Sequence, residues 1–463
     1  MNQHAPFESV SWRLIFVRSG APEVLLFKAG SAWRLPVVEL PDQSRIAMGI
    51  NARVKALWGM DAVSLYHLQL EGYPSSQLYH VAELLPSDAC TPQSARWISG
   101  SELSRDAFEQ ASDFAAVERW LRRFEAPATG RPQSPFETPG WFPVAREMAR
   151  QSAEESSLAL SGRFVQLNAS ASFSLIRFET NREAVWFKAV GEPNLREFDL
   201  MPVLSVRFPE FVPRLLRTKP EWHAWTMLEL SGVPLSRSLG HSGWFAAARD
   251  LARMQIESIT ATRKVLECHA RDIRVQALLN QVKPFFEVMR ELMRCQTAAL
   301  PVPLSDAELY DLELDTREML LDFSSQGIPD TIGHLDLNPD NIITTPGGTL
   351  FLDWAEACVG HPFLSFCYLL EFFSQRFPGN GGSRSLLIRS YLEPWQAAGV
   401  VQDASAILAV CIPLAIFAHA VSTDLWRDSP QRQKPQLAGY YRSLVRRMKR
   451  CRDRSREGAE LLA

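Results

Sequence analysis

Two periodic patterns of apolar and polar residues alternate along the first 125 residues. Short runs rich in apolar, β-branched and aromatic residues are typical of strands, whereas apolar residues three to four positions apart are typical of one helix face. Strands are predicted over Trp12–Arg18, Glu23–Lys28, Ala62–Leu70 and Gln77–Leu85, and helices over Ser44–Trp58 and Phe114–Phe124. This order of strands and helices predicts an α/β sandwich.

A second set of strands begins after residue 160 and gives way to helices. Strands are predicted over Arg163–Asn168, Ser172–Glu179, Ala184–Val190 and Trp225–Leu230, with a helix over Leu195–Arg207. Beyond Gly240 the pattern is helical except for a strand–turn segment at 331–354. A small sheet-rich lobe followed by a larger helical lobe is therefore expected.

Composition indicates where the chain divides into domains and which classes of protein it does not resemble. Residues 126–142 hold four prolines and two glycines and predict a linker. We therefore expect four parts: a domain over 1–125, the linker, a sheet-rich lobe over 143–232 and a helical lobe over 233–463. Net charge of −3 gives no reason to expect nucleic-acid or membrane-surface binding. Ile407–Val421 is apolar but only 15 residues long, which favours a core helix over a membrane span.

The cysteines and the first residues predict a cytoplasmic protein. Seven cysteines occur without a CxxC pair, which argues against a disulfide framework and a cysteine zinc site. The opening residues lack a charged segment followed by an apolar run, so no signal peptide is expected.

The segment from Gly333 to Asn341 carries the clearest candidate chemistry. It reads GHLDLNPDN, and an apolar step leads to Asp353 and Trp354 twelve residues later. Phosphoryl transfer needs an acid to orient the attacking hydroxyl and hard oxygen ligands for magnesium. Asp336 suits the first role, and Asn341 and Asp353 suit the second. His334 is expected to bond to nearby backbone and hold the loop, because no metal-ligand partner lies at suitable spacing.

This H-x-D-x-x-x-x-N motif with its later apolar–Asp–aromatic step resembles the aminoglycoside phosphotransferase and choline kinase group. The resemblance runs from about Pro139 to about Tyr368. It implies a bilobal protein-kinase-like domain of the α+β class that binds ATP and Mg²⁺ and phosphorylates a hydroxyl of a small molecule. On that resemblance Asp336 is the catalytic base, and Asn341 and Asp353 are the magnesium ligands.

Residues upstream extend the resemblance to nucleotide binding. Lys188 lies late in a predicted strand and suits the lysine that holds the ATP phosphates, with Glu197 as its ion-pair partner. The backbone around Glu229–Ser231 would hydrogen-bond adenine where the two lobes join. In the loop before Phe173, the hydroxyls of Ser170 and Ser172 would contact phosphate.

The sequence departs from the family pattern at three places, and two of them weaken parts of this expectation. The loop Leu167–Phe173 contains no glycine, so close approach of its backbone to phosphate is less favoured. Leu335 stands where the family usually has glycine, but protein kinases tolerate a bulky side chain there, so this departure is discounted. Ser365 stands where the family often has an aspartate that steadies the active-site loop, which puts the rigidity of that loop in doubt.

The first 125 residues resemble, more faintly, a Nudix sandwich, and the alternative is an unrelated α/β module. The helix ending at Gly59 stands where a Nudix helix would stand, but the positions expected to be acidic are Arg53, Ala56 and Leu57. We therefore expect a catalytically inactive domain with a binding, regulatory or packing role.

Other functions stay open at this point. The chain could be a nucleotide-binding pseudokinase, or a metabolite-sensing regulatory protein whose first domain controls the second. The basic segment 442–456 is interpreted as a solvated helix face, with anionic-surface binding as the alternative. Cys358 and Cys367 are interpreted as small buried apolar residues, and His361 is expected to pack or hydrogen-bond locally.

Overall fold

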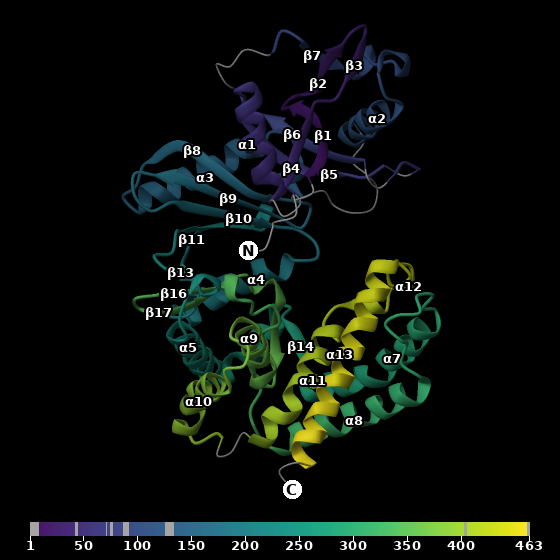
Figure 1. The fold of residues 1–463 in the computed structure, drawn as a ribbon. Helices are drawn as coiled ribbons and strands as arrows, with labels where there is room; N and C mark the ends of the chain where they lie inside the picture. The colour runs from purple at the N-terminus through teal and green to yellow at the C-terminus, as the bar shows by residue number, and fades with distance from the viewer. Residues whose placement is uncertain are drawn as a thin grey trace. The chain divides into compact units, whose positions relative to one another are not determined.

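The computed structural model of the chain describes residues 9–41, 45–70, 72–74, 77–86, 92–125, 134–401 and 405–460. The chain forms two compact units. Unit 1 combines Met1–Phe198 with Arg214–Glu229, and unit 2 combines Asp199–Pro213 with Leu230–Ala463. Both units mix helices and strands (Figure 1), as expected for the α+β class.

Unit 1 begins with a seven-stranded sheet whose central path is β3-β2-β1-β6-β5. Its strands are β1 (Ser9–Arg18), β2 (Ala21–Ala29), β3 (Ala32–Arg34), β4 (Val37–Pro41), β5 (Ala62–Leu68), β6 (Leu78–Leu84) and β7 (Ala95–Ser99). Two helices accompany this sheet, α1 (Ile46–Trp58) and α2 (Ala111–Glu125). Gly59 ends α1 in the left-handed conformation.

The faces of this sheet follow from the alternation of side chains along β1. Leu14 and Phe16 share a core cluster with Ile50 of α1. Ile15 and Val17, which point the other way, share a core cluster with Trp120 of α2. The predicted α/β sandwich is thus present, with one helix against each face. Its likeness to Nudix domains stays a prediction.

A second sheet in unit 1 has the order β11-β12-β10-β9-β8. It contains β8 (Leu160–Ala169), β9 (Phe173–Thr180), β10 (Val185–Val190), β11 (Leu215–Lys219) and β12 (Ala224–Leu228). The strands predicted in this region are confirmed within a few residues at each end. Two further helices in this part of the chain are α3 (Phe142–Glu155) and α4 (Leu195–Arg207).

One hydrophobic core joins the two sheets of unit 1. Trp120 of α2, Phe136, Trp141 and Phe187 of β10 belong to a single cluster of buried residues. Of the predicted linker, 126–133 lie outside the described residues. The remainder is packed, with a short 3₁₀ helix at Pro135–Glu137 and with Trp141 only 2% exposed.

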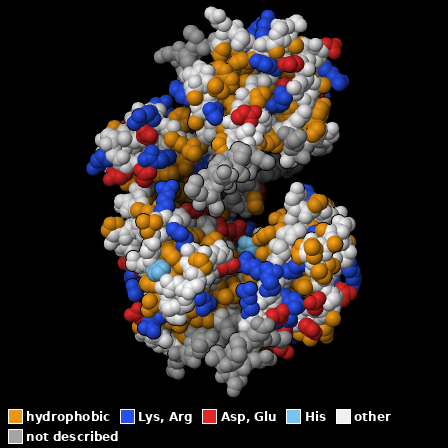
Figure 2. All heavy atoms as spheres, in the orientation of Figure 1, with side chains coloured by type: hydrophobic (Ala, Val, Ile, Leu, Met, Phe, Trp, Pro, Cys, Tyr) orange, Lys and Arg blue, Asp and Glu red, His pale blue; other side chains and the backbone are white. Residues whose placement is uncertain are grey.

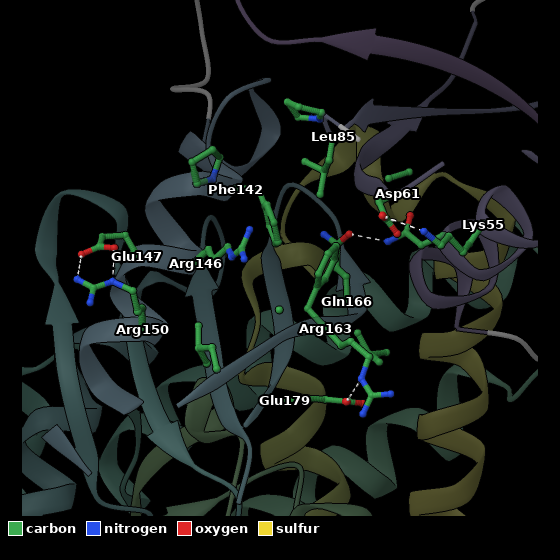
Figure 3. A pocket seen from close by; sticks show the side chains of 18 of the residues that line it. Lys55, Asp61, Leu85, Phe142, Arg146, Glu147, Arg150, Arg163, Gln166 and Glu179 are labelled. Atoms are coloured by element: carbon green, nitrogen blue, oxygen red, sulfur yellow. Dashed lines mark hydrogen bonds and ion pairs between the residues drawn. The ribbon is translucent and has the colours of Figure 1, made fainter. Parts of the chain in front are cut away.

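A buried amide fastens the first sheet to the second. Gln166 of β8 accepts a hydrogen bond from the backbone N–H of Ser64 in β5 (2.8 Å) and donates one to the Ser64 carbonyl (2.9 Å). Its oxygen also accepts from Asn51 of α1 at 3.0 Å (Figure 3). Because β5 is an edge strand, Gln166 satisfies backbone groups that no neighbouring strand reaches. A cavity of about 1420 Å³ opens beside these residues, and Arg146 of α3 lies among its lining.

Unit 2 is mainly helical, as predicted for the region beyond Gly240. Its longer helices are α5 (Ser242–Ser258), α7 (Val275–Arg294), α8 (Asp306–Ser325), α9 (Pro362–Arg376), α10 (Gly381–Ala397), α11 (Ser405–Val421) and α13 (Pro435–Glu460), and its shorter ones are α6 (Thr262–Glu267) and α12 (Ser429–Arg432). Two small sheets carry the strand–turn segment. One has the order β13-β16-β17, from Val233–Pro234, Ile342–Thr345 and Gly348–Phe351. The other has the order β14-β18-β15, from Arg271–Ile273, Ala357–Gly360 and Thr331–His334.

The apolar segment at 407–421 belongs to a core helix, as expected. It lies in α11, where Leu414, Phe417 and Ala418 are fully buried. Within the described ranges, no helix combines the length and the apolar character needed to cross a bilayer. On the face drawn in Figure 2, basic and acidic side chains are intermixed.

The basic segment in α13 differs from its prediction. Arg446 donates to the carbonyls of Pro301 and Val302 at 3.1 Å, so it bonds to the connection before α8. Arg452, whose side chain is 9% exposed, pairs with Asp315 of α8 at 2.7 Å. The interpretation as a solvated face is therefore wrong for these two arginines, which bind inward because partners distant in sequence reach them.

Cys268, Cys295, Cys358, Cys367 and Cys411 take part in no disulfide, and Cys90 lies outside the described residues. Cys358 and Cys367 are buried, which confirms their interpretation as small core residues.

Candidate active site

The candidate catalytic loop starts where β15 ends at His334, and two hydrogen bonds from other elements hold its backbone. The His334 N–H donates to the hydroxyl of Ser365 in α9 at 2.8 Å, and the Leu335 N–H donates to the carbonyl of Glu356 at 3.0 Å. A side chain on Gly333 would come within 2.5 Å of the Ser365 hydroxyl oxygen, so glycine is required there. Ser365 thus supports the loop, which answers the doubt raised by the missing aspartate.

The imidazole of His334 holds the loop from inside. Its Nδ1 accepts from the Asp336 N–H at 3.1 Å, and its Nε2 lies 3.0 Å from the Leu352 carbonyl. A carbonyl only accepts, so Nε2 carries the hydrogen and Nδ1 is bare. Burial lowers the pKa of His334, which agrees with this neutral form. The expected structural role of His334 is confirmed.

Asp336 is exposed and its carboxylate is oriented by two amides. Asn338 donates to one carboxylate oxygen and Asn341 to the other, both at 3.2 Å. Asn341 also donates to the Asp336 carbonyl at 3.0 Å. The carboxylate is therefore fixed in direction while remaining accessible to a substrate hydroxyl. Asn338 was not singled out in the sequence, although its place in an Asn-Pro step after the aspartate is a turn signal.

Asn341 and Asp353 lie at the same end of a hairpin. β16 and β17 pair Ile342 with Phe351, and the Leu352 N–H donates to the Asn341 carbonyl at 2.8 Å. Asp353 follows at once with a φ of 61°, a left-handed conformation that an aspartate tolerates better than most residues. Strained backbone of this kind is concentrated at functional sites.

This pair fits a magnesium ion. Asn341 uses its NH₂ group on Asp336, so its amide oxygen is directed away from that residue. Amide and carboxylate oxygens are ligands that Mg²⁺ accepts, with water and phosphate filling its other positions. Among the residues described, no group of three His, Cys, Asp or Glu side chains offers another metal cage.

In unit 1, Lys188 of β10 forms the expected ion pair with Glu197 in the first turn of α4. Their charged atoms are 2.6 Å apart, and the side chains are 11% and 2% exposed. The Lys188 ammonium also lies 5.6 Å from the Trp225 ring and 6.0 Å from the Phe173 ring. Carboxylate and aromatic faces together hold this cation in one place. Neither ring was singled out in the sequence, because pairing across strands brings them near.

The loop before Phe173 is a tight turn built on Ser170. Its hydroxyl accepts from the N–H groups of Ser172 and Phe173 at 3.2 Å. The Ser172 carbonyl accepts from the Gly191 N–H at 2.7 Å. A serine hydroxyl therefore gives this turn the closure that glycines give in longer loops.

The residues expected to bind adenine lie at the boundary between the units. Unit 1 ends at Glu229, and Ser231 belongs to unit 2. The Glu229 carboxylate pairs with both ends of the Arg177 guanidinium at 2.6 and 2.8 Å, and this pairing lowers the pKa of Glu229. The Glu229 side chain is thus occupied, and its backbone N–H donates to the Ala184 carbonyl at 2.7 Å.

The structure gathers the candidate residues into two groups. Asp336, Asn341 and Asp353 lie together in unit 2, joined by the contacts above. Lys188, Glu197, Ser170 and Ser172 lie in unit 1: Lys188 on β10, Glu197 in α4, and the two serines in the turn between β8 and β9.

Residues 192–397 match a family model described as the phosphotransferase enzyme family (APH). Similar solved structures include a choline kinase from Cryptosporidium parvum, with 12% identity, covering 68% of this chain and 96% of that chain, and a TM-score of 0.47. An ethanolamine kinase from Plasmodium vivax has 11% identity, 72% and 93% coverage and a TM-score of 0.45. A putative aminoglycoside phosphotransferase from Ralstonia eutropha has 16% identity, 67% and 98% coverage and a TM-score of 0.42. No curated protein matches the chain. Residues 192–397, which include Asp336, Asn341 and Asp353, thus carry a domain of the APH phosphotransferase family.

Proposed function

We propose that the chain is a small-molecule kinase that transfers the γ-phosphoryl group of ATP to a hydroxyl of its acceptor. The observation that supports this most directly is the fixed but accessible carboxylate of Asp336. Phosphoryl transfer depends on positioning and charge stabilisation, and this carboxylate positions a nucleophile. The proposed acceptor is a small hydroxylated molecule.

Asp336 accepts the proton of the acceptor hydroxyl as its oxygen attacks the γ-phosphorus. The bond between that phosphorus and the β–γ bridging oxygen breaks, so ADP leaves and a phosphomonoester forms. His334 keeps the Asp336 backbone in place, and the amides of Asn338 and Asn341 keep the carboxylate directed outward. These contacts reduce the reorganisation needed at the moment of transfer.

Nucleotide binding is assigned to the two groups described above. Asn341 and Asp353 would hold Mg²⁺, which neutralises phosphate charge when bound. Lys188, kept in place by Glu197, would contact the α- and β-phosphates, and the hydroxyls of Ser170 and Ser172 would contact the outer phosphates. The backbone from Glu229 to Ser231 would bond adenine.

The division into an N-terminal domain, a connecting segment and two kinase lobes belongs to this proposal, as does a cytoplasmic location. The N-terminal domain is proposed to be catalytically inactive, because α1 carries Arg53, Ala56 and Leu57 where acids would bind metal. Cell fractionation tests the location.

The test measures ADP release by the purified chain with ATP and Mg²⁺ against a panel of hydroxylated amines, sugars and nucleosides. Asp336→Asn is expected to reduce acceptor-dependent turnover by about 10²–10⁴-fold, the usual contribution of a positioned base. Asp322→Asn, an exposed change near the end of α8, is the matched control and should keep full activity. Equal turnover in Asp336→Asn would refute the proposed role. ATP binding without acceptor-dependent turnover would favour a nucleotide-binding pseudokinase instead.

A further inference from the structure

A polar cavity of about 560 Å³ lies in unit 2 at one end of the sheet β14-β18-β15. It is lined by the start of α7, the end of α8, Asp330 and His361. Asp330 precedes β15, and His361 follows β18. Because His334 is the last residue of β15, the cavity lies at the opposite end of these strands from the candidate catalytic loop.

His361 lines this cavity and carries a buried hydrogen-bond donor. The residue is 4% exposed, its ring lies 4.2 Å from that of Phe323, and its Nδ1 accepts from the Phe363 N–H at 3.3 Å as the cap of α9. Burial lowers the pKa of His361 to about 3, so the ring is neutral and its hydrogen is on Nε2. Nε2 is buried and has no acceptor among the described residues. Such a donor is costly to leave unbonded and is typical of a binding site.

The start of α7 adds a second group of donors. This helix has 20 residues, and its first residue, Val275, follows Arg274, whose side chain does not cap it. The N–H groups of the first turn have no acceptor within the helix, and they carry the positive end of its dipole. Val275, Gln276 and Ala277 all line the cavity, so the start of α7 borders the same space as His361.

Asp330 supplies an acceptor of opposite charge. It is half-buried and makes no hydrogen bond or ion pair with another described residue. Burial raises the pKa of its carboxyl group, the nearby Arg274 guanidinium lowers it and the Asp272 carboxylate raises it, so Arg274 offsets the Asp330 charge only in part. Asp272 differs, because Arg274 binds both of its carboxylate oxygens at 2.7 and 2.9 Å.

We propose that this cavity binds a free α-amino acid, with the ammonium group on Asp330 and the carboxylate at the first turn of α7 and His361 Nε2. A cationic and an anionic group on one small molecule match a carboxylate without a hydrogen-bonded partner and donors without acceptors among the described residues beside one cavity. The volume exceeds that of any single amino acid, and Phe323 and Ile328 supply apolar wall for a side chain.

A ligand in this cavity would contact both elements that hold the candidate catalytic loop. Asp330 is joined directly to β15, which ends at His334. His361 caps α9, and Ser365 of that helix accepts the His334 N–H. The site would therefore connect amino-acid binding to the position of His334, beyond the phosphoryl transfer proposed above.

The test measures the melting temperature of the full chain with each of the twenty L-amino acids at millimolar concentration, followed by calorimetric titration of those that raise it. At least one is expected to bind, and its N-acetyl derivative, which lacks the ammonium charge, is expected not to bind. Asp330→Asn should weaken binding at least tenfold while melting no lower than wild type, because it removes a half-buried charge that no hydrogen bond or ion pair from a described residue holds. Ile328→Trp, which fills the cavity without changing its polar groups, should also abolish binding.

The controls separate this site from the candidate active site. Asp336→Asn and Asp322→Asn should both bind the amino acid as wild type does. The proposal is overturned if none of the twenty raises the melting temperature, if binding survives both Asp330→Asn and Ile328→Trp, or if Asp336→Asn abolishes it. Binding needs no turnover, so the proposed kinase activity can fail without affecting this result.

Discussion

Replacing Gln166 by leucine tests whether one buried amide fastens the N-terminal sheet to the second sheet of unit 1. Gln166 is 1% exposed and Ser64 is fully buried. Leucine has similar volume, so the change leaves the packing nearly filled. It removes the partners of the Ser64 N–H and carbonyl, which Gln166 bonds at 2.8 and 2.9 Å.

The expected loss of stability follows from those two backbone groups. Each buried group left without a partner costs about 1–3 kcal/mol, so Gln166→Leu should lower the free energy of unfolding by about 2–6 kcal/mol. The Asn51 amide also loses its 3.0 Å hydrogen bond, so we expect a loss of stability above the lower end of that range.

The assay is urea unfolding followed by circular dichroism, with the midpoints compared at equal slope. Gln151→Leu is the matched control, because Gln151 lies on the partly exposed side of α3 and makes a single bond to Glu147 at 2.8 Å. That control should change stability by no more than about 0.5 kcal/mol. If Gln166→Leu destabilises the chain no more than Gln151→Leu does, the bonds to Ser64 are not what holds the two sheets together.

Three further predictions follow from other buried groups. Ser365→Ala leaves the His334 N–H unbonded, so it should lower the free energy of unfolding by about 1–3 kcal/mol. It should also lower kcat by a larger factor than it changes KM for ATP. An unchanged melting temperature and an unchanged kcat would contradict this prediction. Lys188→Met leaves the Glu197 carboxylate buried without its cation and should cost about 3–5 kcal/mol in thermal unfolding, most of it recovered when Glu197→Gln is added. Burial lowers the pKa of His361 to about 3, so as the pH falls the unfolded chain binds a proton at this residue before the folded chain does. The stability that His361 contributes is therefore complete above pH 6.5 and is lost progressively towards pH 3. His361→Asn keeps a capping acceptor and should reduce that slope by about 1.4 kcal/mol per pH unit, whereas an unchanged slope would show that His361 is not the titrating group.

The strands, helices and candidate catalytic residues were largely predictable because their signals are local. The segment from Gly333 to Asn341 places the proposed base Asp336, the Asn341 amide that orients it and the loop histidine His334 within nine positions, and β15 and the turn after it bring them together. The ion pair between Lys188 and Glu197 could also be predicted, since a strand and the next helix are close in sequence.

Contacts between distant positions were not predictable from the sequence. The sequence left the rigidity of the candidate catalytic loop in doubt at Ser365, yet the Ser365 hydroxyl accepts a hydrogen bond from the His334 N–H across 31 positions. Gln166 meets Ser64 across 102 positions, and Arg452 meets Asp315 across 137. Hydrophobic periodicity shows which face of an element is buried but does not show which polar group it meets.

The left-handed backbone conformation of Asp353 was also not predictable from the sequence. Its neighbour Leu352 is paired through its N–H with Asn341, and the chain turns into a short 3₁₀ helix at Trp354. The presence of an aspartate does not identify this conformation, because aspartate is common in ordinary turns as well.

The continuous core of unit 1 has a consequence for fragments of the chain. A cut within residues 126–133 would part Trp120 from Phe136, Trp141 and Phe187, with which it shares one buried cluster. Each piece would then present an apolar face shaped to the other and would be prone to aggregate when alone. Produced together, the two pieces should associate without a covalent bond, so this chain offers a natural place for a split-protein reporter.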